Sequence, residues 1–296
     1  MKINFHDEVS GAIHFDRPIV ALESTVIAHG LPYPQNIETA RRLENIVREC
    51  GAVPATIAVF DGEITVGLTD EQLETLATAK DIRKISRRDL AVAVAKKLNC
   101  ATTVASTTFI AHMAGIRVFA TGGIGGVHRG YDSDISADLP ELAQTPMIVV
   151  CSGAKIVLDL PATREWLETY GITVLGWQTD EMPAFYTRSS SLPVDEKVIS
   201  VREVARIFDA RKDLGLQNSM LVTVPVPAES EIGQNEIEAI LAEAMNLAAE
   251  AGIKGKDVTP FLLAEMSRLS NGRTLAANIA LLENNARVAA KIACAL

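Results

Sequence analysis

The sequence contains few cysteines, and their positions exclude two common kinds of site. Four cysteines occur in 296 residues, without a CxxC pair or a Cys/His spacing. A disulfide framework or a structural zinc site needs ligands in such regular groups. We therefore expect reduced, mostly buried thiols. The four residues are Cys50, Cys100, Cys151 and Cys294.

Long apolar runs and an excess of basic residues are also missing. No run approaches the roughly 20 apolar residues that a membrane-spanning helix needs, and the start, MKINFHDEVS, lacks the basic and apolar regions of a secretion signal. The 28 basic and 37 acidic residues give a formal net charge of -9, which opposes non-specific attraction to a polyanion. We expect a cytoplasmic protein that binds neither membranes nor nucleic acid.

Nothing in the sequence marks a domain boundary. The sequence contains no internal repeat, no low-complexity tract and no long linker rich in glycine, serine or proline. Hydrophobic residues make up 48% and charged residues 22%, which is the balance of a globular protein with a packed core. We predict a single domain that spans residues 1–296.

Short apolar runs alternate with amphipathic helical patterns along the chain. The runs are rich in Val, Ile and Ala, which suits strands that are buried on both faces. They span residues 18–22, 55–60, 117–121, 147–151, 172–175 and 219–224. The predicted helices span residues 36–49, 70–79, 88–98, 163–170, 201–214, 235–251 and 271–295. This alternation predicts an α/β fold with a mainly parallel central sheet flanked by helices.

One local departure from parallel pairing is expected. Asp61 and Gly62 stand between two apolar runs, and an Asp-Gly pair favours a tight hairpin turn. We therefore predict a local β-hairpin excursion at residues 60–64. Ligands of parallel sheets collect at the carboxyl ends of the strands, and four polar clusters of this sequence fall at such ends.

The first cluster is Glu23-Ser24-Thr25, which directly follows an apolar run. A carboxyl group at a strand end is a candidate general acid, because burial and neighbouring charges tune its pKa. The alternative is a carboxylate that caps the following turn. His29, a few residues later, is more typical of a loop or a satisfied core histidine than of a catalyst.

The second cluster is the basic stretch KISRRD, residues 84–89, at the start of a predicted helix. Three cations and a serine at this position favour phosphate binding, because a helix N-terminus adds a partial positive charge. The alternative is a solvated charged face in which Ser86 or Asp89 caps the helix.

The third cluster is the glycine-rich stretch TGGIGGVHRG, residues 121–130. Four glycines in five positions permit a close approach of amide N–H groups to an anion. Asp132, Asp134 and Asp138 follow and offer the hard oxygen ligands that suit Mg²⁺ or Mn²⁺. An aspartate-rich surface loop is the alternative, but the two adjacent segments together favour a site.

The fourth cluster contains Lys155, a lone lysine among small and apolar residues after a predicted strand. Lysine is depleted in such places unless it is paired or functional. Burial lowers the pKa of a lysine amine and gives a neutral nucleophile that forms Schiff bases with carbonyl groups. A snorkelling lysine at a helix start is an equally supported alternative.

Two amides lie on one apolar face of the last predicted helix. Asn278 and Asn285 share this face with Leu281 and Leu282 because of their helical spacing. Buried amides need hydrogen-bond partners. We expect Asn285 in the core or at an interface, and Asn278 either in the core or at a bound ligand.

In this order, the clusters resemble those of the pseudouridine-5′-phosphate glycosidases, a family also called indigoidine synthase A-like. The resemblance runs through essentially the whole chain, from ALEST (21–25) through SRRD and TGGIGGVHRG to NIAL (278–281). It implies an α/β fold, a homotrimer and one manganese ion, Mn²⁺, in each site. It also implies a lyase-type glycosidase that reversibly cleaves the carbon–carbon glycosidic bond of pseudouridine 5′-phosphate to uracil and ribose 5-phosphate.

The resemblance further implies roles for individual residues. Lys155 resembles the nucleophile that forms a Schiff base with the ring-opened ribose, and Glu23 resembles the proton donor. Asp134 resembles the manganese ligand, although the preceding stretch is shorter than in the family, which leaves Asp132 as the alternative ligand. The residues that resemble substrate contacts are Lys84, Val104, His128, Ser136, Ala137, Asp138 and Asn278.

Two other functions use the same kinds of residue. A Schiff-base aldolase or another sugar-phosphate lyase needs the same lysine and phosphate grip, but only the glycosidase releases uracil. A catalytically silent sugar-phosphate-binding protein would keep the scaffold without the chemistry. All the matched polar positions are present, which argues against a silent protein.

Overall fold

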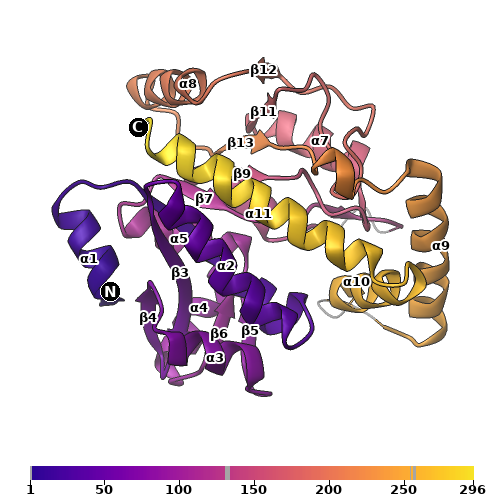
Figure 1. The fold of residues 1–296 in the computed structure, drawn as a ribbon, viewed down its shortest axis with the longest axis horizontal. Coiled ribbons are helices and arrows are strands. Elements are labelled where there is room, and N and C mark those ends of the chain that lie inside the picture. The colour runs from indigo at the N-terminus through magenta and orange to yellow at the C-terminus, as the bar shows by residue number, and fades with distance from the viewer. Residues whose placement is uncertain (1, 131–133, 254, 256–257) are drawn as a thin grey trace.

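The computed structural model describes residues 2–130, 134–253, 255 and 258–296 (Figure 1). Its central sheet has the strand order β1-β4-β3-β2-β7-β9-β13-β11-β12, and β6 pairs at the side with β3 and β5. The strands are β1 (Ile3–Phe5), β2 (Ile19–Glu23), β3 (Val53–Phe60), β4 (Glu63–Val66), β5 (Arg83–Ile85), β6 (Cys100–Thr102), β7 (Val118–Ala120), β9 (Ile148–Cys151), β11 (Thr173–Trp177), β12 (Glu196–Val198) and β13 (Met220–Thr223). A separate antiparallel pair joins β8 (Val127–His128) to β10 (Leu158–Asp159).

Parallel pairing dominates the central sheet. The pairs from β3 through β2, β7, β9, β13 and β11 to β12 are all parallel, whereas β3 pairs antiparallel with β4 and with β6. The central strand β9 is buried along its whole length, as expected for a strand covered on both faces. The predicted α/β fold with a mainly parallel sheet is confirmed.

Helices pack against this sheet and connect most of its strands. They are α1 (Asp7–His14), α2 (Gln35–Glu49), α3 (Asp70–Thr78), α4 (Leu90–Ala95), α5 (Val104–Met113), α6 (Asp138–Leu142), α7 (Leu160–Thr169), α8 (Val201–Asp213), α9 (Gln234–Glu250), α10 (Val258–Leu269) and α11 (Arg273–Ala293). The long helix α11 crosses the molecule beside α2 and contacts β2, β7 and β9 (Figure 1). Its inward face is therefore placed against the central strands.

The predicted β-hairpin excursion is confirmed between β3 and β4. Phe60 pairs with Glu63 in an antiparallel register. Asp61 and Gly62 have φ values of 49° and 77°, and two positive φ angles are what a type I′ hairpin turn requires. A Cβ atom at Gly62 would lie 2.6 Å from the carbonyl oxygen of Val94, so this glycine is also required for space.

The predicted helix at residues 88–98 is too long at both ends. The chain instead forms a short 3₁₀ turn, Arg87–Asp89, followed by α4, and Lys97 leaves the helical region with a φ of 52°. The sequence also gave no prediction for α1, α5, α6, α10 or the short strands β1, β5, β6 and β12. These elements are short or weakly amphipathic, so their patterns resemble those of loops.

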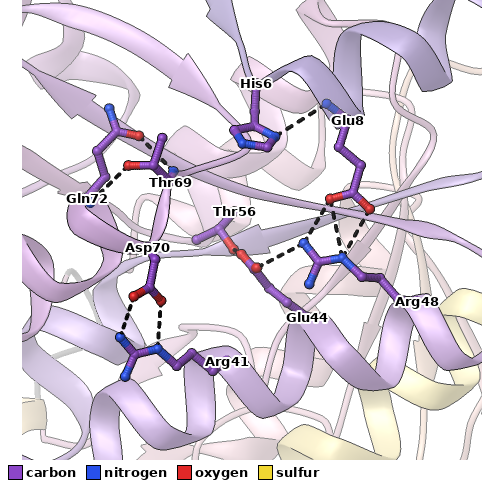
Figure 2. Close-up of polar contacts among 9 residues, drawn as sticks. All are labelled: His6, Glu8, Arg41, Glu44, Arg48, Thr56, Thr69, Asp70 and Gln72. Carbon is purple, nitrogen blue, oxygen red and sulfur yellow. Dashed lines mark hydrogen bonds and ion pairs between the residues drawn. The ribbon is translucent and has the colours of Figure 1, made fainter.

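Helices α1 and α2 are joined by a charged cluster that contains one buried carboxyl group (Figure 2). Glu44 on α2 is buried and accepts hydrogen bonds from Thr56 Oγ1 at 2.7 Å and from Arg48 Nη2 at 3.3 Å. Arg48 also donates to Glu8 Oε2 on α1 at 2.8 Å. Burial raises the pKa of Glu44, while Thr56 and Arg48 oppose this rise.

The cysteines are all free thiols, in agreement with the prediction, but they are not mostly buried. Cys100 and Cys151 are buried, Cys50 is half-buried and Cys294 is exposed. Cys294 lies at the end of α11, where the helix leaves the core. Within the part of the chain that the structure describes, no helix combines the length and the apolar character needed to cross a bilayer.

Candidate active site

The residues predicted to form a site meet in one cavity of about 400 Å³. Its walls come from the end of β2, from β5 and the 3₁₀ turn that follows it, from the start of α5, and from the loops after β7 and β9. Nine of the ten predicted residues line it, namely Glu23, Lys84, Val104, His128, Asp134, Ser136, Ala137, Asp138 and Lys155.

The tenth predicted residue, Asn278, lines a smaller cavity of about 50 Å³ next to the first. Glu23, Lys84 and Lys155 line both cavities, so the two spaces adjoin at these side chains. The wall of the smaller cavity is largely apolar on one side, where Phe185 and Leu282 lie. The fold therefore brings all ten predicted residues together around one branched space.

Glu23 is a buried carboxyl group at the junction of the two cavities. It is 8% exposed and accepts a short hydrogen bond from Thr121 Oγ1. Burial raises the pKa of Glu23, and the charge of Lys155 and the Thr121 hydroxyl oppose this rise in part. A carboxyl group with a raised pKa holds its proton to higher pH, as a general acid requires.

Lys155 lies in the turn after β9, opposite the glycine-rich loop. Its backbone N–H donates to the carbonyl oxygen of Ile124 at 3.1 Å, and Ile124 N–H donates to the carbonyl oxygen of Gly153 at 3.1 Å. The nearest helix, α7, begins only at Leu160, so Lys155 is not at a helix start. The alternative of a snorkelling lysine at a helix start is therefore wrong for this chain.

The glycine-rich loop packs closely against the rest of the protein, and one of its N–H groups is bonded within the protein. Gly125 N–H donates to Asp138 Oδ2 at 2.8 Å, and Ala105 N–H donates to Asp138 Oδ1 at 2.9 Å. A Cβ atom at Gly125 would lie 2.1 Å from Ser136 Oγ, and one at Gly126 would lie 2.3 Å from the hydroxyl of Thr163. The expectation that the loop amides face an anion is wrong for Gly125, because Asp138 occupies its N–H.

The cations of the basic stretch do not all line the cavity. Lys84 and Arg88 line the cavity, and so does Arg83. Arg87 is directed elsewhere, since its guanidinium lies 3.1 Å from the buried carboxylate of Glu141 and over the ring of Phe109. Sequence reasoning placed Arg87 among the phosphate-binding cations, and the contact with Glu141 corrects this prediction.

A serine in the same stretch offers a hydroxyl to the cavity. Ser86 N–H donates to Asp89 Oδ2 at 3.0 Å. Asp89 therefore caps this turn, as expected if Ser86 or Asp89 serves as a cap. Ser86 Oγ is itself buried and has no hydrogen-bond partner among residues 2–130, 134–253, 255 and 258–296. Buried polar atoms need partners, and a phosphate oxygen in the cavity would supply one.

Of the three carboxylates predicted as metal ligands, Asp134 and Asp138 are described and line the cavity, but both oxygens of Asp138 accept hydrogen bonds from backbone N–H groups. Asp134 is exposed and lines the cavity, whereas Asp132 lies outside the described residues. No group of three or more His, Cys, Asp or Glu side chains that could hold a metal occurs in the described part of the chain. Mn²⁺ fits such a site if water supplies most of its ligands, as is common for hard divalent ions with few protein ligands.

Several lining residues were not predicted from the sequence. Thr25 lines both cavities, and its buried Oγ1 has no hydrogen-bond partner among the described residues. Thr259 lines both cavities from α10, and Phe185 lines the smaller one. Thr25 was within reach of sequence reasoning because it follows Glu23 so closely, but α10 and the Phe185 loop carried no motif.

The fold and the cavity together define a class of protein. A half-buried lysine, a buried carboxyl group and a basic rim line one cavity at the strand ends of an α/β sheet, as in enzymes that combine a nucleophile with an acid on an anionic substrate. The chain belongs to the indigoidine synthase A-like family, whose model matches residues 8–295.

Relatives with curated names and solved structures agree with this family. Proteins named pseudouridine-5′-phosphate glycosidase from Caldanaerobacter subterraneus subsp. tengcongensis and Geobacillus kaustophilus are 55% and 53% identical, over 99% and 98% of this chain and 96% and 97% of theirs. An indigoidine synthase A-like protein from Thermotoga maritima matches with a TM-score of 0.91 and 39% identity, over 99% of this chain and 95% of that one. The prealnumycin C-glycosynthase AlnA, in complex with ribulose 5-phosphate, matches with a TM-score of 0.91 and 40% identity, over 99% and 96%.

Proposed function

We propose that this chain is a lyase-type glycosidase that cleaves the carbon–carbon glycosidic bond of pseudouridine 5′-phosphate and gives uracil and ribose 5-phosphate. The observation that carries the proposal is the placement of Glu23 and Lys155 in the wall of both adjoining cavities. The names of the relatives and the sugar phosphate bound to AlnA support a phosphorylated C-glycoside as the substrate.

The two cavities suit the two halves of this substrate. The larger one has Lys84 and Arg88 on its rim, together with the Ser86 hydroxyl, which has no hydrogen-bond partner among the described residues; these groups suit a phosphate dianion. The smaller one combines an apolar wall with the amide of Asn278, which suits a flat base with polar edges. The bond to be cleaved would then lie between them, beside Glu23 and Lys155.

The reaction needs a nucleophile and an acid because the leaving atom is carbon. Uracil bonded through C5 has no glycosidic nitrogen to accept a proton, so direct departure would leave a carbanion. The Lys155 amine first replaces the ring oxygen at C1′: the N–C1′ bond forms as the C1′–O4′ bond breaks, and a proton of the amine passes to O4′, which becomes a hydroxyl of the opened ribose. The nitrogen lone pair then forms a C1′=N bond as the C1′–C5 bond breaks. The electron pair of the broken bond stays on uracil C5 and takes the proton of Glu23.

Water completes the cycle. It adds to the C1′=N carbon and releases ribose 5-phosphate, and the Lys155 amine is free for the next substrate. Glu23 is ionised after donating its proton and recovers one from solvent. Thr121 holds the Glu23 carboxyl through its hydroxyl during both steps.

Mn²⁺ is proposed as the cofactor, with Asp134 as its protein ligand and water as the remaining ligands. A bound divalent ion would supply charge stabilisation for substrate oxygens near the rim. The homotrimer and the single-domain organisation stay predictions.

A Schiff-base aldolase remains the second candidate, because Lys155 and the basic rim would serve it equally well. The base distinguishes the two reactions. An aldolase has no need of the apolar side cavity that Asn278 and Phe185 line, so this cavity favours the glycosidase.

The test is uracil release from pseudouridine 5′-phosphate in the presence of Mn²⁺, followed by ultraviolet absorbance and mass spectrometry. We expect wild type to release uracil and to be trapped by borohydride with ribose 5-phosphate on Lys155. Lys155→Ala should lose both activities, and Lys155→Arg, which keeps the charge but forms no imine under these conditions, should lose them as well. Active aldol cleavage of other sugar phosphates without uracil release would overturn the proposal.

A further inference from the structure

Asn285 on α11 contacts the loop after β7 and the loop after β9 and lines neither cavity of the site. Its side chain is 0% exposed. The amide donates to the carbonyl oxygens of Thr121 at 2.8 Å and Gly122 at 3.3 Å, and to Ser152 Oγ at 3.1 Å. One buried amide therefore contacts both the loop after β7 and the loop after β9.

These two loops carry the partners of the acid and of the nucleophile. Thr121 donates its hydroxyl hydrogen bond to Glu23 from the first loop. Ser152 begins the turn that leads to Lys155 on the second loop, and its N–H donates to the carbonyl oxygen of Gly122 at 2.8 Å. The loops are thus bonded to each other as well as to Asn285, which fixes how far apart the two functional side chains lie.

The apolar surroundings of Asn285 make its hydrogen bonds to the two loops specific. Leu281 and Leu282 precede it on α11 and are buried against the same sheet. An amide in such surroundings has no water to replace a lost partner, so the loops are held where its N–H groups point. Its neighbour Asn284 is half-buried and donates instead to the carbonyl oxygen of Pro225 at 3.3 Å, not to Thr121, Gly122 or Ser152.

We propose that Asn285 is a positioning residue. By bonding to both the Thr121 loop and the Ser152 loop, it fixes the positions of Glu23 and Lys155 relative to each other. It touches no substrate, and it acts through the Thr121 carbonyl and hydroxyl on the acid, and through Ser152 on the turn that carries the nucleophile. This inference rests on the proposed function, because Glu23 and Lys155 are the acid and the nucleophile of that reaction.

The experiment compares Asn285→Ala with the matched variant Asn284→Ala in uracil release. We expect Asn285→Ala to lower kcat by about 10- to 100-fold, the range that a small misplacement of reacting groups produces, and to leave KM nearly unchanged. Asn284→Ala should keep the wild-type kcat. Thermal unfolding and circular dichroism of both variants establish that they are folded. If Asn285→Ala is not folded, Ser152→Ala, which removes the side-chain contact with Asn285 and leaves its contacts with the two backbone carbonyls, should lower kcat in the same direction.

The pH dependence of kcat distinguishes a positioning role of Asn285 from a general loss of stability. Glu23 faces Lys155, Lys84 and Asp138 as well as Thr121, and the hydrogen bond from Thr121 lowers the pKa of Glu23. If Asn285→Ala displaces Thr121, that pKa rises, and the alkaline limb of kcat moves to higher pH. Thr121→Val should move the limb in the same direction and should add little to the Asn285→Ala variant.

Each result has a defined meaning. If wild type releases no uracil, the proposed function fails. If wild type is active but Asn285→Ala matches Asn284→Ala, or lowers kcat without moving the alkaline limb, the positioning role alone is overturned. Fully additive effects of Thr121→Val and Asn285→Ala would also overturn it.

Discussion

At the scale of single residues, the proposed reaction depends on one carboxyl group whose burial raises its pKa. Glu23 is removed from water at the end of β2, and burial raises its pKa despite the nearby charge of Lys155. The same burial that suits an acid makes the ionised form costly for the folded protein. Function and stability therefore oppose each other at this position.

Glu23→Gln should show this opposition directly. We expect kcat to fall by about 10²- to 10⁴-fold, the usual contribution of a positioned acid. Because the folded pKa is raised, the folded wild type binds more protons than the unfolded chain above pH 4.5, and its stability falls as pH rises through the folded pKa. Glutamine does not ionise, so the Tm of the variant should exceed that of wild type by a margin that grows with pH.

The control for this comparison is Glu49→Gln, which changes an exposed carboxyl group at the end of α2. It should alter neither kcat nor the dependence of Tm on pH. A Glu23→Gln protein whose Tm follows pH as wild type does would show that Glu23 ionises freely in the folded state. In wild type, kcat itself should fall as pH rises through the same folded pKa.

At the scale of elements, the attachment of α1 to α2 depends on a single arginine (Figure 2). Arg48 is the cation beside the buried Glu44 and also binds Glu8 of α1. Arg41, two turns earlier on the same helix, pairs instead with the exposed Asp70. The helix thus offers a partly buried ion pair and an exposed one for direct comparison.

Arg48→Ala should destabilise the fold by about 1 kcal/mol at neutral pH, a value reduced for the solvent screening of a side chain that is 41% exposed. The loss arises because Glu44 is left buried without its cation. It should shrink as pH falls and Glu44 becomes protonated, since its pKa is raised already in wild type. Urea unfolding at several pH values measures this dependence. Arg41→Ala should change stability less, and equal losses in the two variants would contradict the role given to Glu44.

At the scale of the whole molecule, charge is distributed unevenly. The chain carries a formal net charge of -9, yet the larger cavity has Arg83, Lys84 and Arg88 on its rim. The same cavity is lined by Asp89, which lies 3.7 Å from Arg83 and 4.0 Å from Arg88, so the cations of the rim stand beside a carboxylate. The expectation that the protein does not bind nucleic acid stays a prediction.

Removal of the metal tests whether the activity of the whole protein needs Mn²⁺. A chelator should lower uracil release, and added Mn²⁺ should restore it, while Tm changes little because one exposed carboxylate and water hold the ion weakly. Asp134→Asn should weaken Mn²⁺ binding measured by electron paramagnetic resonance, independently of activity. If Asp132→Asn weakens binding and Asp134→Asn does not, the ligand assignment is wrong.

The sequence by itself determined the strand and helix alternation, the hairpin at Asp61-Gly62 and the identity of the lysine and carboxyl candidates. These features depend on local patterns, such as apolar runs and turn residues, that can be recognised in the sequence alone. The family was also accessible, because its motifs are contiguous segments of the chain. Confirmation of the family and of the α/β fold came from the comparisons and the sheet topology.

Only the tertiary structure decided which groups the motifs face. Arg87 and Lys84 are equivalent cations in the sequence, but Arg87 turns to the buried Glu141 while Lys84 lines the cavity. The N–H of Gly125 donates to the carboxylate of Asp138 rather than to a bound anion, and Asn285 reaches Thr121 from a helix 164 positions away in the sequence. Such contacts join segments that are distant along the chain, and burial selects among partners that a local pattern leaves equivalent.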